Sequence, residues 1–166
     1  MYYINCFFIY SIIGFIFENV VGIITNNNFN SGILYGPITP IYGFGVILIL
    51  IISKYLFLHL HMPRWKETII SFFILIIVLT GLEFLGGIVI EKIFGIVFWD
   101  YSDFKFNIGK YISLEISFLW GILSIFIIYI IHPLLDNFIR KIPRLITFIA
   151  IFIVIVDLTI TIINKI

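Results

Sequence analysis

Residues 83–121 read EFLGGIVIEKIFGIVFWDYSDFKFNIGKYISLEISFLWG, an acidic and aromatic stretch between two apolar runs. It holds three glutamates, two aspartates and two tryptophans: Glu83, Glu91, Glu115, Asp100, Asp103, Trp99 and Trp120. The apolar runs are typical of membrane helices, and a carboxylate in a membrane is costly. We therefore expect this stretch to carry the function and the flanking helices to hold it in place.

The composition around this stretch is that of a membrane protein. Of the 166 residues, 62% are hydrophobic and 11% are charged, whereas globular proteins are about half apolar and a quarter charged. The net charge of +1 argues against a nucleic-acid partner, which needs a concentrated basic surface. The single cysteine, Cys6, excludes an internal disulfide.

Five segments are long and apolar enough to span a bilayer, which takes about 20 residues. They are Tyr2–Ile24, Pro40–Leu58, Thr68–Glu91, Tyr111–Leu135 and Pro143–Ile163. The sequence thus predicts an all-α, polytopic helix bundle, with residues 1–166 forming a single transmembrane domain. The first segment is interpreted as a retained helix, because no basic region or cleavage site accompanies it.

The basic residues favour one orientation of these helices. Six lie on one side (Lys54, Arg64, Lys66, Arg140, Lys141 and Arg144) and four on the other (Lys92, Lys105, Lys110 and Lys165). The positive-inside rule then places the N-terminus in the cytoplasm and the C-terminus outside.

The acids gather toward one membrane face when they are followed through the alternating helices. They are Glu18, Glu83, Glu91, Glu115 and Asp157. Helical spacing places most of them on stripes of small residues, where membrane helices approach closely. These stripes are Ser11-Gly14-Glu18-Gly22-Thr25 and Thr80-Glu83-Gly87-Glu91, with Asp157, Thr161 and Asn164 neighbours in the last helix. The fourth helix has a stripe without an acid, Ser113-Ser117-Gly121-Ser124, and Glu115 is turned away from it. We expect Glu18, Glu83 and Glu115 to approach one another.

Two interpretations of the acids stay open. They line a polar pocket for a cation, a proton or a polar substrate, or each is a neutral strut that hydrogen-bonds between helices. The aromatic loop Lys92–Lys110, which contains Trp99, Asp100 and Asn107, also has two interpretations. It is an anchor in the membrane interface, or a cap folded over the bundle. The segment Gly32–Gly45, which contains Tyr35, is either a tight surface loop or irregular backbone that lines the mouth of the pocket.

Motifs for catalysis are missing from the sequence. It contains no phosphate-binding loop, CxxC or HExxH, so we predict no cofactor and no metal site, and an enzymatic role is not favoured. His59 and His61 lie on the basic side without an acid or cysteine nearby.

Several motifs in order resemble a family of small bacterial membrane proteins labelled putative ABC-transporter permeases (type IV). They are Gly14–Glu18, Gly32–Gly43, Glu83-Phe84, Glu91–Gly95, Trp99–Ser102, Asn107–Gly109 and Trp120-Gly121. The resemblance covers roughly Ile12 to Pro133. It implies a transport role in the bacterial plasma membrane. If the protein uses ATP, a separate subunit must bind it, because no ATP-binding motif is present in this chain.

The predicted function is therefore a transport-related, permease-like subunit in the lipid bilayer, acting alone, as a homo-oligomer or with an ATP-binding partner. The residues expected to bind substrate or ion are Glu18, Glu83, Glu91, Glu115, Tyr35, Trp99, Asp100 and Asn107. Two alternatives are kept: a metal-dependent intramembrane enzyme acting on a lipid or prenyl substrate, because hard cations take oxygen ligands, and an accessory protein with purely structural acids.

Overall fold

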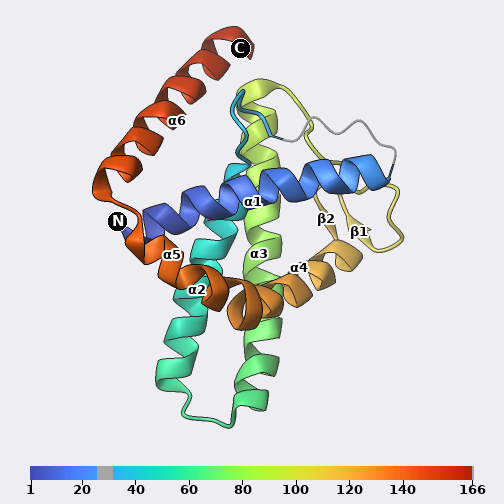
Figure 1. Cartoon of the computed structure of the whole chain (residues 1–166). Helices are drawn as coiled ribbons and strands as arrows, with labels where there is room; N and C mark the ends of the chain where they lie inside the picture. The colour runs from blue at the N-terminus through green and yellow to red at the C-terminus, as the bar shows by residue number, and fades with distance from the viewer. Residues whose placement is uncertain (26–31, 166) are drawn as a thin grey trace. The chain divides into compact units, whose positions relative to one another are not determined.

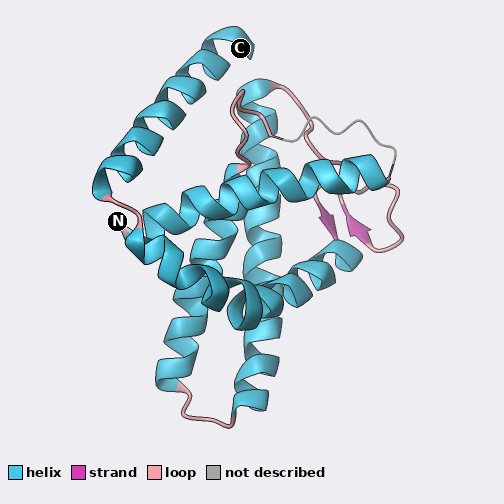
Figure 2. Ribbon diagram, in the orientation of Figure 1, coloured by secondary structure: helices cyan, strands magenta, loops and turns pink. Residues whose placement is uncertain are grey.

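The computed structural model describes residues 1–25 and 32–165, and within them the chain is almost entirely helical (Figures 1 and 2). The elements in order are α1 (Tyr2–Ile24), α2 (Pro40–His59), α3 (Arg64–Phe94), β1 (Asn107–Ile108), β2 (Ile112–Ser113), α4 (Leu114–Phe126), a π-helix (Ile127–Ile131), α5 (His132–Lys141) and α6 (Arg144–Lys165). Part of the neutral loop expected between the first two helices, residues 26–31, lies outside the described residues.

Five helical stretches in the described ranges are long and apolar enough to cross a membrane. They match the five predicted segments, so the prediction of a polytopic all-α membrane protein is confirmed. The fourth is a continuous stretch, Leu114–Lys141, in which α4 passes through the π-helix into α5. Pro133 has no backbone N–H to donate to the preceding turn, and such a missing bond is a common reason for a local change of helix type.

Two helix starts differ from the prediction by three residues or more, and α6 begins at Arg144, one residue after the predicted Pro143. The third helix begins at Arg64 rather than Thr68, directly after Pro63, because proline's fixed φ suits a helix start. The fourth begins at Leu114 rather than Tyr111, and the Ser113 side chain caps it by accepting from the backbone N–H of Ile116. The residues just before Leu114 instead form β2, which pairs antiparallel with β1.

The chain divides into two compact units, each described by itself: Met1–Ile47 with Leu135–Ile166, and Leu48–Leu134. In the first unit, the N-terminal end of α1 is bonded to α5 and α6. Asn5 donates to the Ile139 carbonyl (3.4 Å) and accepts from the Thr147 hydroxyl (2.6 Å), and the Tyr2 hydroxyl donates to Asp136. Since apolar contacts give membrane helices little drive to associate, such polar bonds and close packing hold them together.

Small residues allow the close approach of α1 to the start of α2. A Cβ added at Gly43 would lie 2.6 Å from the Phe7 carbonyl oxygen, and one added at Gly14 would overlap the Tyr42 ring. The backbone N–H of Thr39 donates to the Ser11 carbonyl at 3.0 Å. The predicted stripe on the first helix is therefore a packing surface.

In the second unit, α4 packs against α3 through the stripe of small residues that the sequence predicts for the fourth helix. The buried residues of α3 recur every four positions: Glu67, Ser71, Leu75, Leu79, Glu83 and Gly87. The predicted stripe that leads into α4 is buried, and Glu115 is turned away from it as predicted. Glu115 is exposed, whereas the sequence suggested a second partner facing it. Gly121 lies against Phe72 and Ile76 of α3.

Candidate functional site

The loop between α3 and α4 folds back onto α3. Gly95, with φ of 65°, ends α3 in the left-handed conformation, which glycine adopts without steric cost. Further along the loop, the β1–β2 hairpin reverses the direction of the chain. The backbone N–H of Tyr101 then donates to the Lys110 carbonyl at 2.8 Å. The loop therefore contacts α3, which fits the cap interpretation, and its place relative to the membrane interface stays a prediction.

Glu83 is the most deeply buried of the predicted site residues, with 4% of its surface exposed. Its Oε1 accepts a hydrogen bond from the Tyr101 hydroxyl at 2.7 Å. The indole of Trp120 lies beside the same carboxyl group. The hydroxyl of Thr80, one helical turn away, is buried and has no hydrogen-bond partner in residues 1–25 and 32–165. We call Thr80, Glu83, Tyr101 and Trp120 the Glu83 site.

Glu91, two turns further along α3, is held by the far end of the loop. It forms an ion pair with Lys110 and accepts from the Tyr111 hydroxyl. The hydrogen bond to Glu91 raises the pKa of Lys110, and burial, together with the bond to Glu91, raises the pKa of Tyr111. Because over a third of each side chain of the ion pair is exposed, water screens the pair and it stabilises the protein only weakly.

The Trp99 ring packs edge-on against the Tyr111 ring, with 6.2 Å between centroids. Its indole N–H is buried and finds no hydrogen-bond acceptor in the part of the chain that is described. Trp99 is thereby linked to Glu91 through Tyr111. A buried donor without an acceptor is uncommon in native proteins and is a natural place for a polar ligand atom or water.

Three further predicted site residues make local bonds. Asp100 accepts hydrogen bonds from the backbone N–H and the hydroxyl of Ser102, at 2.8 and 2.5 Å. The bond from the hydroxyl, followed by the bond from the backbone N–H, lowers the pKa of Asp100 below its usual range. Glu115 accepts from the Ser113 hydroxyl (2.7 Å) and the Phe106 N–H (3.3 Å). The Asn107 amide donates to the Gly109 carbonyl at 3.0 Å. These bonds stabilise the loop and the start of α4.

The remaining predicted residues, Glu18 and Tyr35, belong to the first unit. Glu18 is half-buried on α1 and accepts from the Thr39 hydroxyl at 3.5 Å. The backbone N–H groups of Tyr35 and Gly36 donate to the two carboxylate oxygens of Asp157, at 2.9 and 2.8 Å. The expected approach of Glu18 to Glu83 and Glu115 stays a prediction.

Comparison with known proteins matches residues 5–164 to the family described as Putative ABC-transporter type IV. The chain belongs to this family. No curated protein and no solved structure matches it. The match extends beyond the motifs seen in the sequence and includes all the helices that carry the site residues. Together with the five apolar helices, it establishes a multi-pass membrane protein of a transport-related family.

In this type IV family member, several residues around the predicted acids were not predicted as site residues. They are Thr39, Tyr101, Lys110, Tyr111 and Trp120. Tyrosine is the residue that the sequence could have indicated, because its hydroxyl can donate to a carboxylate while its ring remains in an apolar environment. Which tyrosine donates to which acid depends on the path of the loop between α3 and α4.

The structure also tests the acids as metal ligands. Within residues 1–25 and 32–165, no three side chains of His, Cys, Asp or Glu come together as they would around a metal ion. The nearest neighbours of Glu83 and Glu91 are tyrosine, tryptophan and lysine. These groups donate hydrogen bonds, so the surroundings suit a carboxylate that acts as an acceptor.

Asp157 ties the Tyr35-Gly36 segment to α6, and we expect Asp157→Asn to release it. An amide has only one acceptor oxygen, so one backbone N–H would face the NH2 group instead. Hydrogen bonds to charged groups are worth about 1.5–3 kcal/mol. Hydrogen exchange at the Tyr35 and Gly36 amides, measured by mass spectrometry or NMR, should therefore become about tenfold faster or more.

Thr159→Val is the matched control for this change. Thr159 lies on the same helix, is exposed, and bonds back to the Ile155 carbonyl at 2.8 Å. Its replacement should leave exchange at Tyr35 and Gly36 unchanged. Equal exchange rates in Asp157→Asn and the unaltered protein would show that Asp157 does not hold the segment.

Proposed function

We propose that this chain is a transport subunit of the bacterial plasma membrane in which Glu83 binds a cation or a small polar substrate. The observation that carries the proposal is the state of the Glu83 carboxylate. It is 4% exposed, one oxygen accepts from Tyr101, and the other has no hydrogen bond of good geometry to a described residue.

The charge balance around Glu83 supports a cationic ligand or an exchanged proton. No lysine, arginine or histidine in the described ranges forms an ion pair with Glu83, and its bonded partner Tyr101 is a neutral donor. A buried carboxylate that is not paired costs free energy. A bound cation, a protonated amine or a proton would each remove that cost. The buried hydroxyl of Thr80 adds a polar atom on the same face of α3.

The surroundings of the other predicted site residues separate structural residues from candidates for ligand contact. We propose that Glu91, Glu115, Asp100 and Asn107 have mainly structural roles, because their bonds hold the loop on α3 and the start of α4. Trp99 packs against Tyr111 in the same loop, and its buried indole N–H keeps it a candidate for ligand contact. In the first unit, Glu18 and Tyr35 stay candidates for ligand contact, because Glu18 is half-buried and its polar neighbours are the hydroxyl groups of Tyr42 and Thr39, the latter at 3.5 Å. We propose that residues 1–166 work as one transmembrane domain.

Membership of the type IV family supports a separate ATP-binding subunit. The test is capture of the tagged full chain from solubilised membranes, with bound proteins, lipids and metals identified by mass spectrometry. We expect an ATP-binding subunit in a near-stoichiometric amount. Recovery of the intact chain with bound metal and a converted lipid product, and without any ATP-binding protein, would contradict the transport role and select the enzyme.

The proposed orientation places Ser102 outside and Arg64 in the cytoplasm. Cys6 is buried, so single cysteines introduced at Ser102, Thr25 and Arg64 should be the reactive ones. A membrane-impermeant thiol reagent added to intact cells should label Ser102→Cys and Thr25→Cys but not Arg64→Cys. Lysed cells are the control, in which all three should react. Labelling of Arg64→Cys alone in intact cells would reverse the orientation.

A further inference from the structure

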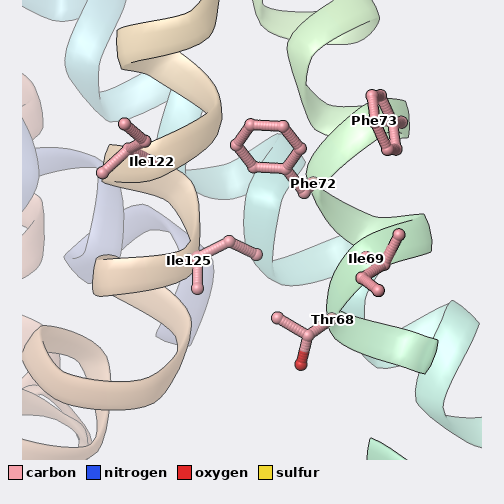
Figure 3. A pocket seen from close by; sticks show the side chains of 6 residues that line it. All are labelled: Thr68, Ile69, Phe72, Phe73, Ile122 and Ile125. Atoms are coloured by element: carbon pink, nitrogen blue, oxygen red, sulfur yellow. The ribbon is translucent and has the colours of Figure 1, made fainter. Parts of the chain in front are cut away.

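An apolar groove of about 320 Å³ runs between α3 and α4 in the second unit, and its lining is shown in Figure 3. It is lined by Thr68, Ile69, Phe72, Phe73, Ile122 and Ile125. The one polar group among these side chains, the Thr68 hydroxyl, already forms hydrogen bonds within the protein. It donates to the Arg64 carbonyl and is bonded to the Tyr129 hydroxyl, both at 2.8 Å. In Figure 3 that hydroxyl points away from Phe72. The surface of the groove is therefore made of hydrocarbon groups, which suit an apolar ligand.

One end of the groove lies next to the first turn of α3. Residues four apart share a helix face, so Arg64, Thr68 and Phe72 form one row. Trp65, Ile69 and Phe73 form the row beside it. Ile69, Phe73 and Ile122 are each about half exposed or more, so the groove is open along its side.

Two positive charges lie at this end of the groove. Arg64 and Lys66 are exposed, and neither forms an ion pair with any residue in 1–25 or 32–165. The Lys66 ammonium lies 5.3 Å from the Trp65 ring centroid, and Trp65 is 61% exposed. The nearby acid, Glu67, lies instead on the buried row of α3. An exposed tryptophan beside basic side chains is typical of the level of the lipid headgroups.

We propose that this groove holds one acyl chain of an anionic phospholipid, whose phosphate is bound by Arg64 and Lys66. The dimensions fit a lipid of one leaflet. Arg64 and Phe73 are nine residues apart, about 14 Å along a helix, and half the hydrocarbon core of a bilayer is about 15 Å. A partner helix fits less well, because membrane helices pack through small residues and this lining is isoleucine and phenylalanine.

The test uses Trp65 as a reporter of bound lipid. The full chain carrying Trp99→Phe and Trp120→Phe keeps Trp65 as its single tryptophan. It is reconstituted into phosphatidylcholine vesicles that contain equal mole fractions of brominated phosphatidylglycerol or brominated phosphatidylcholine. We expect brominated phosphatidylglycerol to quench Trp65 more strongly at low mole fractions. Each basic side chain should contribute about fivefold to the relative association constant.

Arg64→Gln with Lys66→Gln should abolish this difference. Lys92→Gln is the matched control, because it removes one positive charge from the other end of the same helix, and it should leave the difference unchanged. Equal quenching by the two brominated lipids, or an equal loss of the difference in the control, would overturn the proposal.

A second measurement does not depend on the tryptophan substitutions. Native mass spectrometry of the unaltered chain, from detergent containing equal amounts of the two lipids, should show one phosphatidylglycerol retained in preference. Arg64→Gln with Lys66→Gln should remove that preference. Equal retention of both lipids by the unaltered chain would contradict an anionic lipid site, and a bound protein in their place would assign the groove to a partner helix.

Discussion

Glu83→Gln is expected to abolish transport by this chain while the protein still folds. Glutamine keeps the shape of the side chain and can still accept the hydrogen bond from the Tyr101 hydroxyl. It removes the negative charge that a bound cation or an exchanged proton needs. Losing one partner of a buried charge pair costs about 2–5 kcal/mol, which corresponds to at least a roughly 30-fold weaker affinity for the ligand.

Stability should change little or improve, because an unpaired buried charge is itself costly. The measurements are complementation of a deletion strain and thermal unfolding of the purified protein in detergent. Asp103→Asn is the control, because it makes the same change from acid to amide at an exposed position in the loop after α3. Full complementation by Glu83→Gln would end the functional interpretation of Glu83. Loss of the fold would identify Glu83 as an ionised structural group instead.

Gly87→Ala is expected to displace the loop from α3. A Cβ at Gly87 would lie 2.5 Å from Cδ1 and 2.7 Å from Cγ of the Tyr111 ring, which is 5% exposed and has no free space to enter. Overpacking of this kind costs about 1–3 kcal/mol. The displaced ring would lose its bond to Glu91 and its contact with Trp99.

Gly81→Ala in the same helix is a close control. Nothing lies within 4 Å of a Cβ at Gly81, and alanine in a helix interior is favoured over glycine by about 0.5–1 kcal/mol. Thermal unfolding in detergent should therefore move to a lower temperature for Gly87→Ala and to an equal or higher temperature for Gly81→Ala. Trp99 fluorescence should change in the first variant alone. Similar unfolding temperatures in the two variants would show that Tyr111 is not held against Gly87.

The amino-acid sequence by itself determined the helices and the faces they bury. A bilayer leaves the backbone no water to bond with, so apolar segments of about 20 residues must form helices. The helical period then places Ser117, Gly121 and Ser124 on one face of α4, and all three are buried. Glu115 falls on another face by the same rule and is exposed.

The partners of the acids were decided only by the tertiary structure. Tyr101 reaches Glu83 because Gly95 ends α3 and the loop turns back, and Asp157 meets the Tyr35 backbone across 122 residues of sequence. Spacing along a helix says nothing about such contacts, because they depend on how loops and separate helices are placed in space. The sequence could indicate that Glu83 points into the protein, but whether it meets a hydroxyl, a lysine or a second acid depends on the path of the loop.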